Sequence, residues 1–201
     1  NTDDSGSGSL REAITQANAA SGADTIEFNI AGAGLHTISL ATVLPSITDQ
    51  LAIDGYSQPG AAPNTHATAN NAAIRIRIDG SSAGVGSGID LTASAGDSSV
   101  SGLMITGFSG VGINVDGDNS TITGNWVGSD GVSAIANTGD GIVVTADNVD
   151  VGGTDPADRN LVSGNDGNGI VAYGSAASAT FQGNWVGLDA SGQQSIANGQ
   201  S

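Results

Sequence analysis

The sequence contains no cysteine and no lysine, and only 3% of its 201 residues are aromatic. Without cysteine, the fold can have neither disulfide bonds nor thiolate chemistry. With so few large side chains, a globular core of the ordinary kind is not expected. The hydrophobic fraction of 38% comes mainly from small aliphatic residues, which argues against disorder and favours a fold whose layers lie close together.

Positive charge is almost absent. Four arginines oppose 20 acidic residues, which gives a formal net charge of −16. Binding of nucleic acid requires several cations that face phosphate groups, and an anionic membrane surface requires the same. We therefore expect no nucleic-acid partner and no membrane partner.

No run approaches the roughly 20 apolar residues of a membrane-spanning helix, so we expect no membrane insertion. Because the sequence starts at Asn1 without an initiator Met, we expect it to be a processed or excised segment.

One amphipathic helix is predicted near the start of the chain. Ser9 and Glu12 form an S-x-x-E capping box, and Gly22 is a candidate stop signal. The apolar residues between them recur at helical spacing: Leu10, Ala13, Ile14 and Ala17. These signals predict a helix over residues 10–20 that caps one end of the fold, with Arg11 and Glu12 on the surface.

The predicted boundaries divide the chain into an N-terminal segment with the capping helix (1–22) and a series of coils (23–201). Short apolar runs bounded by Gly, Asn, Asp or Pro predict strands at 24–30, 36–40, 50–55, 73–80, 88–92 and 100–107. Residues 56–71 contain two prolines and have no apolar period, so they predict a long loop on one face of the coils.

The second half of the chain is repetitive. Gly-Ile pairs begin at residues 88, 112, 141 and 169, a period that is typical of solenoids. Each repeat contains three short strands and no helix, which predicts an all-β, right-handed parallel β-helix with coils about 4.8 Å apart. One coil cannot bury its apolar face alone, so stacking makes the core. No polar cap is visible at the last coil, and we expect the chain to continue or meet a partner there.

Three stretches of the sequence resemble one known family. They are "SGSGSLREAITQANAASGADTIEFNI" (5–30), "LPSITDQLAIDGYSQPG" (44–60) and the segment from "IRIDGSSAG" to "GFSGVGI" (76–113). They are similar to bacterial secreted right-handed parallel β-helix repeat proteins with an N-terminal SLREA-type motif, over nearly the whole chain. The resemblance implies a modular, secreted or surface-attached protein without indicating an activity. Members often have Cys before the SLREA segment, where this chain has Gly8, so no cysteine-dependent role carries over.

Three asparagines share one position in successive coils. "GNWVG" occurs at 124–128 and again at 183–187, and Asn160 occupies the matching place between the two copies. Stacked, inward-facing amides can hydrogen-bond to one another and to the backbone of the turns. Asn125, Asn160 and Asn184 therefore predict a structural ladder.

The residue after each of these asparagines then points outward, because side chains alternate along a strand. This predicts an external row of Trp126, Leu161 and Trp185, for which two interpretations stay open. In one, the long turns that follow the tryptophans fold back, so that Ile135 and Ile196 cover the indoles. In the other, the row is a ligand-binding platform on which sugar rings stack.

Acidic residues supply the candidate chemistry. If the protein is an enzyme, Asp155, Asp158, Asp166 and Arg159 are the candidate catalytic residues, since a glycoside hydrolase needs two carboxylates at a set separation. The absence of lysine disfavours a polysaccharide lyase. Acidic residues are also common in turns for purely structural reasons, and no catalytic residue is then expected.

Two turns place oxygen ligands close together in sequence, which suits Ca²⁺. The candidate ligands are Asp116 and Asp118 in one turn and Asp155 in the other. Neither turn matches a known calcium loop, and solvated acidic turns are the alternative. His36 and His66 have no partner motif, so no zinc site is expected, and no other cofactor is indicated.

Together these patterns favour a non-enzymatic structural or adhesive module of a secreted or cell-surface bacterial protein. An open last coil could pair with the start of another copy, because an uncovered strand edge is a template for strand addition. This predicts self-association, end to end, into a filament. The alternative is a carbohydrate-active enzyme, hydrolase or lyase, or a glycan-binding module.

Overall fold

The computed structural model describes residues 1–174, 176 and 178–199, and within them the strands form three parallel sheets. Sheet A contains, in spatial order, β1 (Asp24–Glu27), β3 (Leu51–Asp54), β6 (Ser99–Ser101), β9 (Thr121–Thr123), β12 (Asp150–Gly152) and β15 (Thr180–Gln182). Sheet B contains β2 (His36–Ser39), β4 (Ile76–Asp79), β7 (Leu103–Thr106), β10 (Trp126–Val127), β13 (Leu161–Val162) and β16 (Trp185–Val186). Sheet C contains β5 (Ile89–Leu91), β8 (Ile113–Val115), β11 (Ile142–Val144) and β14 (Ile170–Ala172).

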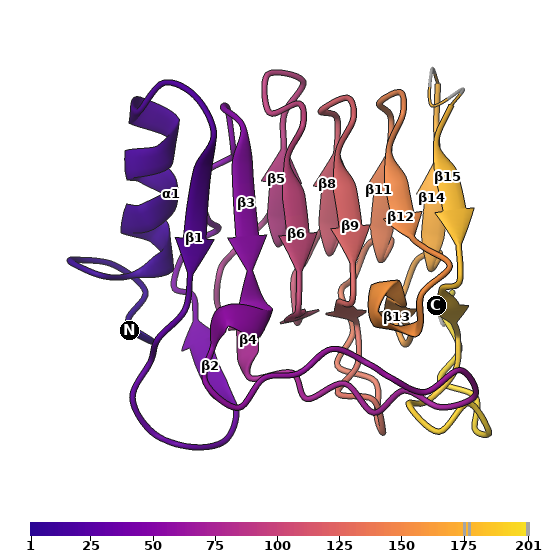
Figure 1. Cartoon of the computed structure of the whole chain (residues 1–201). Helices are drawn as coiled ribbons and strands as arrows, with labels where there is room; N and C mark the ends of the chain where they lie inside the picture. The colour runs from indigo at the N-terminus through magenta and orange to yellow at the C-terminus, as the bar shows by residue number, and fades with distance from the viewer. Residues whose placement is uncertain (175, 177, 200–201) are drawn as a thin grey trace.

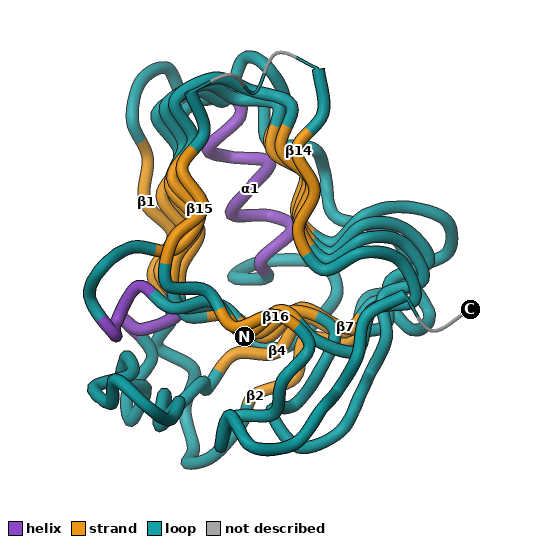
Figure 2. The backbone as a smooth tube through the Cα atoms, turned by 90° about the vertical axis from the view of Figure 1, so that its right-hand side faces the viewer, coloured by secondary structure: helices purple, strands orange, loops and turns teal. Residues whose placement is uncertain are grey.

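The chain passes from sheet to sheet in repeated circuits, each of which we call a coil. Every strand pairs in parallel with its counterpart in the next coil, so the coils stack along one axis (Figure 1). Viewed down that axis, the three sheets form the sides of a closed outline (Figure 2). The chain is mostly β with one α-helix among the described residues, an arrangement consistent with an all-β parallel solenoid.

The strands are shorter than predicted, and one prediction is wrong. Residues 100–107 form two strands, β6 and β7, which belong to sheets A and B. Gly102 separates them with a φ of 69°, a left-handed conformation that glycine adopts without steric cost. A Cβ at this position would also lie 2.7 Å from the backbone nitrogen of Tyr56. The apolar run therefore turns a corner in its middle.

The helix α1 (Leu10–Ala19) lies across the first coil, as Figures 1 and 2 show. Its buried residues, Leu10, Ile14 and Ala17, join the core of the coils. The Ser9 hydroxyl accepts a hydrogen bond from the Glu12 backbone at 3.2 Å, as the capping box predicts. The helix ends at Ala19 with an extended Ala20, so Gly22 is not the residue that stops it.

Arg11 is not a simple surface residue. Its guanidinium lies 2.6 Å from the Asp4 carboxylate and donates to the carbonyls of Thr42 and Val43 at 2.6 and 2.7 Å. The hydrogen bond from Arg11 lowers the pKa of Asp4 below its ordinary value. Arg11 therefore ties the N-terminal segment and α1 to the loop after β2.

Aliphatic side chains stack in continuous columns inside the coils. In sheet A the register aligns one inward residue from each coil: Ile26, Ile53, Val100, Ile122, Val151 and Phe181. In sheet B the column is Ile38, Ile78, Ile105, Val127, Val162 and Val186. All but the last member of each column are buried. Each inward side chain is thus buried by other residues of its own coil and by its counterparts in the coils on either side.

Two asparagine ladders run through the interior beside these columns. In the first, the Asn125 backbone N–H donates to Asn160 Oδ1 at 2.9 Å, and Asn160 Nδ2 donates to Asn184 Oδ1 at 2.9 Å. The sequence does not reveal the second ladder as readily. There Asn137 Nδ2 donates to Asn165 Oδ1 and Asn165 Nδ2 donates to Asn198 Oδ1, both at 2.9 Å. The amides satisfy backbone groups at the corners, where the strand pairing is interrupted.

The first ladder leads to a stability prediction. Asn160→Ala leaves the Asn125 N–H and the Ile122 carbonyl, which accepts from Asn160 Nδ2 at 2.7 Å, buried without these partners. Because each buried unpaired group costs about 1–3 kcal/mol, we expect a loss of at least about 2 kcal/mol in the free energy of unfolding. Urea titration measures the loss.

The exposed Asn168 is the matched control. Asn168→Ala should change the free energy of unfolding by less than about 0.5 kcal/mol. Equal effects of the two substitutions would contradict a structural role for the ladder.

Candidate functional site

The strand register of sheet B brings the outward residues into one row. Met104 pairs with Trp126, Trp126 with Leu161, and Leu161 with Trp185. The candidate platform residues are thus neighbours on the outer face of the sheet. They are not a bare surface, however: Leu161 is fully buried and both tryptophans are partly buried.

The long turns after β10 and β16 fold back over the indoles. A Cβ on Gly131 would lie 2.6 Å from Trp126 Cζ3, and a Cβ on Gly192 would lie 2.6 Å from Trp185 Cη2. Trp126 Nε1 is buried and has no hydrogen-bond partner in the described part of the chain. The turn backbone at the two glycines therefore covers part of each indole, as the first interpretation expects of the long turns. Ile196, which that interpretation places over an indole, is itself buried.

One face of Trp185 is occupied by Arg159. The guanidinium carbon lies 4.4 Å from the centre of the indole ring, a cation–π contact, and the Arg159 residue is only 8% exposed. Burial lowers the pKa of the guanidinium. A sugar ring cannot stack on that face while Arg159 occupies it.

The candidate catalytic side chains serve local structure. Asp155 caps the short 3₁₀ helix η2 (Pro156–Asp158), since its carboxylate accepts from the Ala157 backbone at 2.9 Å. Asp158 packs against Gly153, and Asp166 is half-buried in a turn. Among the described residues, no side-chain hydrogen bond or ion pair joins any two of Asp155, Asp158, Arg159 and Asp166; the Asp158 backbone N–H donates to the Asp155 carbonyl at 3.0 Å within η2. The contacts of Asp155 and Asp158 are thus those of acidic residues that stabilise a turn.

The candidate calcium ligands are also engaged in local hydrogen bonds. Asp116 accepts from Asn114 Nδ2 at 3.0 Å and from the Thr145 hydroxyl, and Asp118 accepts from the Asp147 backbone at 2.9 Å. In the described part of the chain, no three acidic or histidine side chains come together in an arrangement that could hold a metal ion. Asp155 caps η2, in the segment between β12 and β13.

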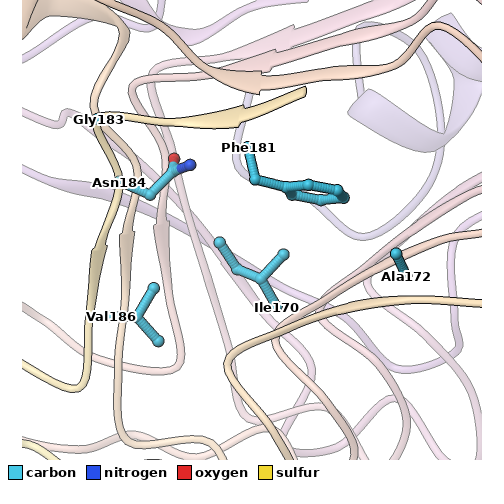
Figure 3. Close-up of a pocket in the computed structure, with 6 residues that line it drawn as sticks. All are labelled: Ile170, Ala172, Phe181, Gly183, Asn184 and Val186. Carbon is cyan, nitrogen blue, oxygen red and sulfur yellow. The ribbon is translucent and has the colours of Figure 1, made fainter. Parts of the chain in front are cut away.

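The open end of the last coil forms a hollow with an apolar lining. It has a volume of about 390 Å³ and is lined by Ile170, Ala172, Phe181, Gly183, Asn184 and Val186. Figure 3 shows the side chains of Ile170, Phe181 and Val186 turned toward the same space. Phe181 and Val186 end the two interior columns and are 41% and 46% exposed. The β14, β15 and β16 strands are the edges of their sheets at this end.

Comparison with known proteins identifies no relative. No family model matches the chain, and searches of curated proteins and of solved structures found no match. No helix in the described residues has the length and apolar character that a membrane crossing requires.

The cover over Trp185 can be tested with two glycines of similar conformation. Gly192 and Gly84 have φ values of 73° and 79°, but a Cβ on Gly84 would meet nothing within 4 Å. Gly192→Ala should lift the turn from the indole and move the tryptophan emission maximum to longer wavelength. Gly84→Ala imposes the same backbone strain and should leave the emission unchanged.

The measurement is steady-state fluorescence of the folded proteins at one temperature. An unchanged spectrum for Gly192→Ala would mean that the turn does not cover Trp185 in solution.

Proposed function

We propose that the chain is a right-handed parallel β-helix and serves as a non-enzymatic structural or adhesive module of a secreted or cell-surface bacterial protein. The continuous pairing of strands through the three sheets supports a rigid rod-like module. The SLREA-type segment, which contributes α1, supports the assignment to secreted bacterial repeat proteins.

The observation that carries this proposal is the difference between the two ends. At one end α1 buries Leu10, Ile14 and Ala17 against the first coil. At the other end, the interior columns run out into an apolar hollow of about 390 Å³. Such a surface is suited to association with another protein surface, because burying it removes apolar area from water.

For the occupant of the open end we propose a second copy of this chain, arranged tail to tail. A head-to-tail filament would require α1 to leave the first coil, which would expose the three side chains that it buries. Two open ends can cover each other without any such change, and a twofold contact of this kind closes after two subunits. The net charge of −16 opposes association, so the contact should strengthen as salt screens the repulsion.

A carbohydrate-active enzyme or glycan-binding module has less support. Arg159 and the turn at Gly192 cover parts of Trp185, and Asp155 is engaged in capping a 3₁₀ helix. No contact among the described residues favours a catalytic role of Asp155 over its role as the cap of η2.

Sedimentation velocity tests the proposal. We expect a monomer at low concentration and a dimer, but no larger species, as the concentration rises in 0.5 M NaCl, a salt level at which charges are screened beyond about 4 Å. Val186→Asp places a charge in the middle of the apolar end and should abolish the dimer. Val132, 80% exposed at the tip of a turn, is the matched control, and Val132→Asp should not change the dimer.

Two results would overturn the proposal. A strictly monomeric protein at all concentrations would rule out the tail-to-tail contact, and filaments would show that α1 is displaced.

A panel of polysaccharides, assayed for new reducing ends and unsaturated products, tests the enzymatic alternative. Product formation that is lost in Asp158→Asn would replace a structural role with a catalytic one.

A further inference from the structure

The segment between β3 and β4 runs along most of the length of the stack (Figure 1). We call residues 58–73 the strap. It leaves the second coil and runs along the axis to the last coils, as the purple trace along the lower side of Figure 1 shows. Residues 56–57 of the predicted loop belong instead to the 3₁₀ helix η1 (Gly55–Ser57).

The strap has a defined internal structure. Ala62 and Ala73 exchange backbone hydrogen bonds at 3.1 and 2.8 Å, which closes its base. At its tip Asn64, 1% exposed, accepts from the backbone N–H groups of His66 and Asn71 at 3.1 and 3.0 Å. A segment without regular secondary structure is thus held in one shape by its own asparagines.

Arg159 holds this tip against the stack. Its guanidinium donates to the carbonyls of His66 and Ala69 at 2.9 Å and to that of Ala67 at 2.8 Å. Its Nε donates to the Gly183 carbonyl in the last coil at 3.3 Å. No carboxylate of the described residues forms an ion pair with it. Neutral carbonyls and the indole of Trp185 therefore surround the buried charge, and both Nη atoms of Arg159 donate to carbonyls of the strap.

Two further contacts fasten the tip. Asn64 Nδ2 donates to the Pro156 carbonyl at 2.9 Å, and the Asn70 N–H donates to the Ala190 carbonyl at 2.7 Å. Pro156 precedes β13, and Ala190 lies in the turn after β16. The strap therefore connects the second coil to the last two coils by contacts between residues 92 (Asn64 and Pro156) and 120 (Asn70 and Ala190) positions apart in sequence.

A coil at the end of a stack has a neighbour on one side only, and a repeat array opens most easily from such an end. At the first coil α1 supplies the missing neighbour. We propose that the strap acts on the last coil from the side: it is a clamp that keeps the last two coils of the described chain folded and in register, with Arg159 as its positioning residue.

This inference does not rest on the proposed self-association. The clamp acts within one chain, and it is tested on the monomer at low concentration. A failure of the dimer prediction would leave the clamp untouched, and a failure of the clamp would leave the dimer contact untouched.

Amide hydrogen exchange followed by mass spectrometry tests the clamp. Arg159→Ala should speed exchange at least about tenfold in residues 63–72 and 180–199, because several charge-assisted hydrogen bonds are lost. Exchange in residues 24–55 and 99–127 should stay unchanged. Arg77 is the matched control: it lies in β4 of sheet B, and its Nε donates to Thr106 Oγ1 and not to the strap. Arg77→Ala should leave exchange in both strap and last coil as in the wild type.

Two more variants keep the test decisive if Arg159→Ala folds poorly. Arg159→Lys keeps the charge but not the fork, and it should release the same two regions to a smaller extent. Asn64→Ala removes the other anchor of the strap. The double variant Asn64→Ala with Arg159→Lys should speed exchange by a smaller factor than the product of the factors for the two single variants, because both residues hold the same segment. Exchange that accelerates evenly over all coils, or that stays slow in residues 63–72, would overturn the clamp.

Discussion

The stacking of one coil on the next is the interaction on which the whole structure depends. Strands of two to four residues cannot stand alone, and a single coil buries little apolar surface. In register, however, each aliphatic side chain covers its counterpart in the neighbouring coil, and each asparagine amide pairs with the one above it. Any residue that shifts the register would misalign the columns, the ladders and the sheets together.

This dependence on neighbours makes the ends the weak points, and the protein treats them differently. The helix α1 adds apolar cover to the first coil, and Arg11 with Asp4 fastens that cover. The last coil keeps an apolar hollow but is held from outside by the strap and Arg159. The outer row that contains both tryptophans becomes part of this second arrangement. The turns at Gly131 and Gly192 and the guanidinium of Arg159 pack against the tryptophans on sheet B, which gives these two rare residues a structural use.

Much of the fold follows from local sequence signals. The capping box predicts the start of α1, and the repeated "GNWVG" predicts the ladder of Asn125, Asn160 and Asn184. The prediction of one strand over 100–107 overlooks Gly102, although an isolated glycine in a strand pattern signals a bulge or a close backbone approach. The role of Arg159 cannot be read from the sequence, because its guanidinium donates to backbone carbonyls, which every residue has: those of His66, Ala67, Ala69 and Gly183. A signal for the second ladder was present in the repeated "IAN" at 135–137 and 196–198, whose asparagines align with Asn165.

The central claim, that inward asparagines join successive coils, has a direct spectroscopic test. Nuclear magnetic resonance detects scalar coupling across a hydrogen bond from the donor nitrogen to the acceptor carbonyl carbon. The account predicts such a coupling between the Asn125 backbone nitrogen and the Asn160 side-chain carbonyl carbon, which a 2.9 Å hydrogen bond connects, together with slow exchange of the Asn125 amide. A rapidly exchanging Asn125 amide without this coupling would contradict the stacked-coil account.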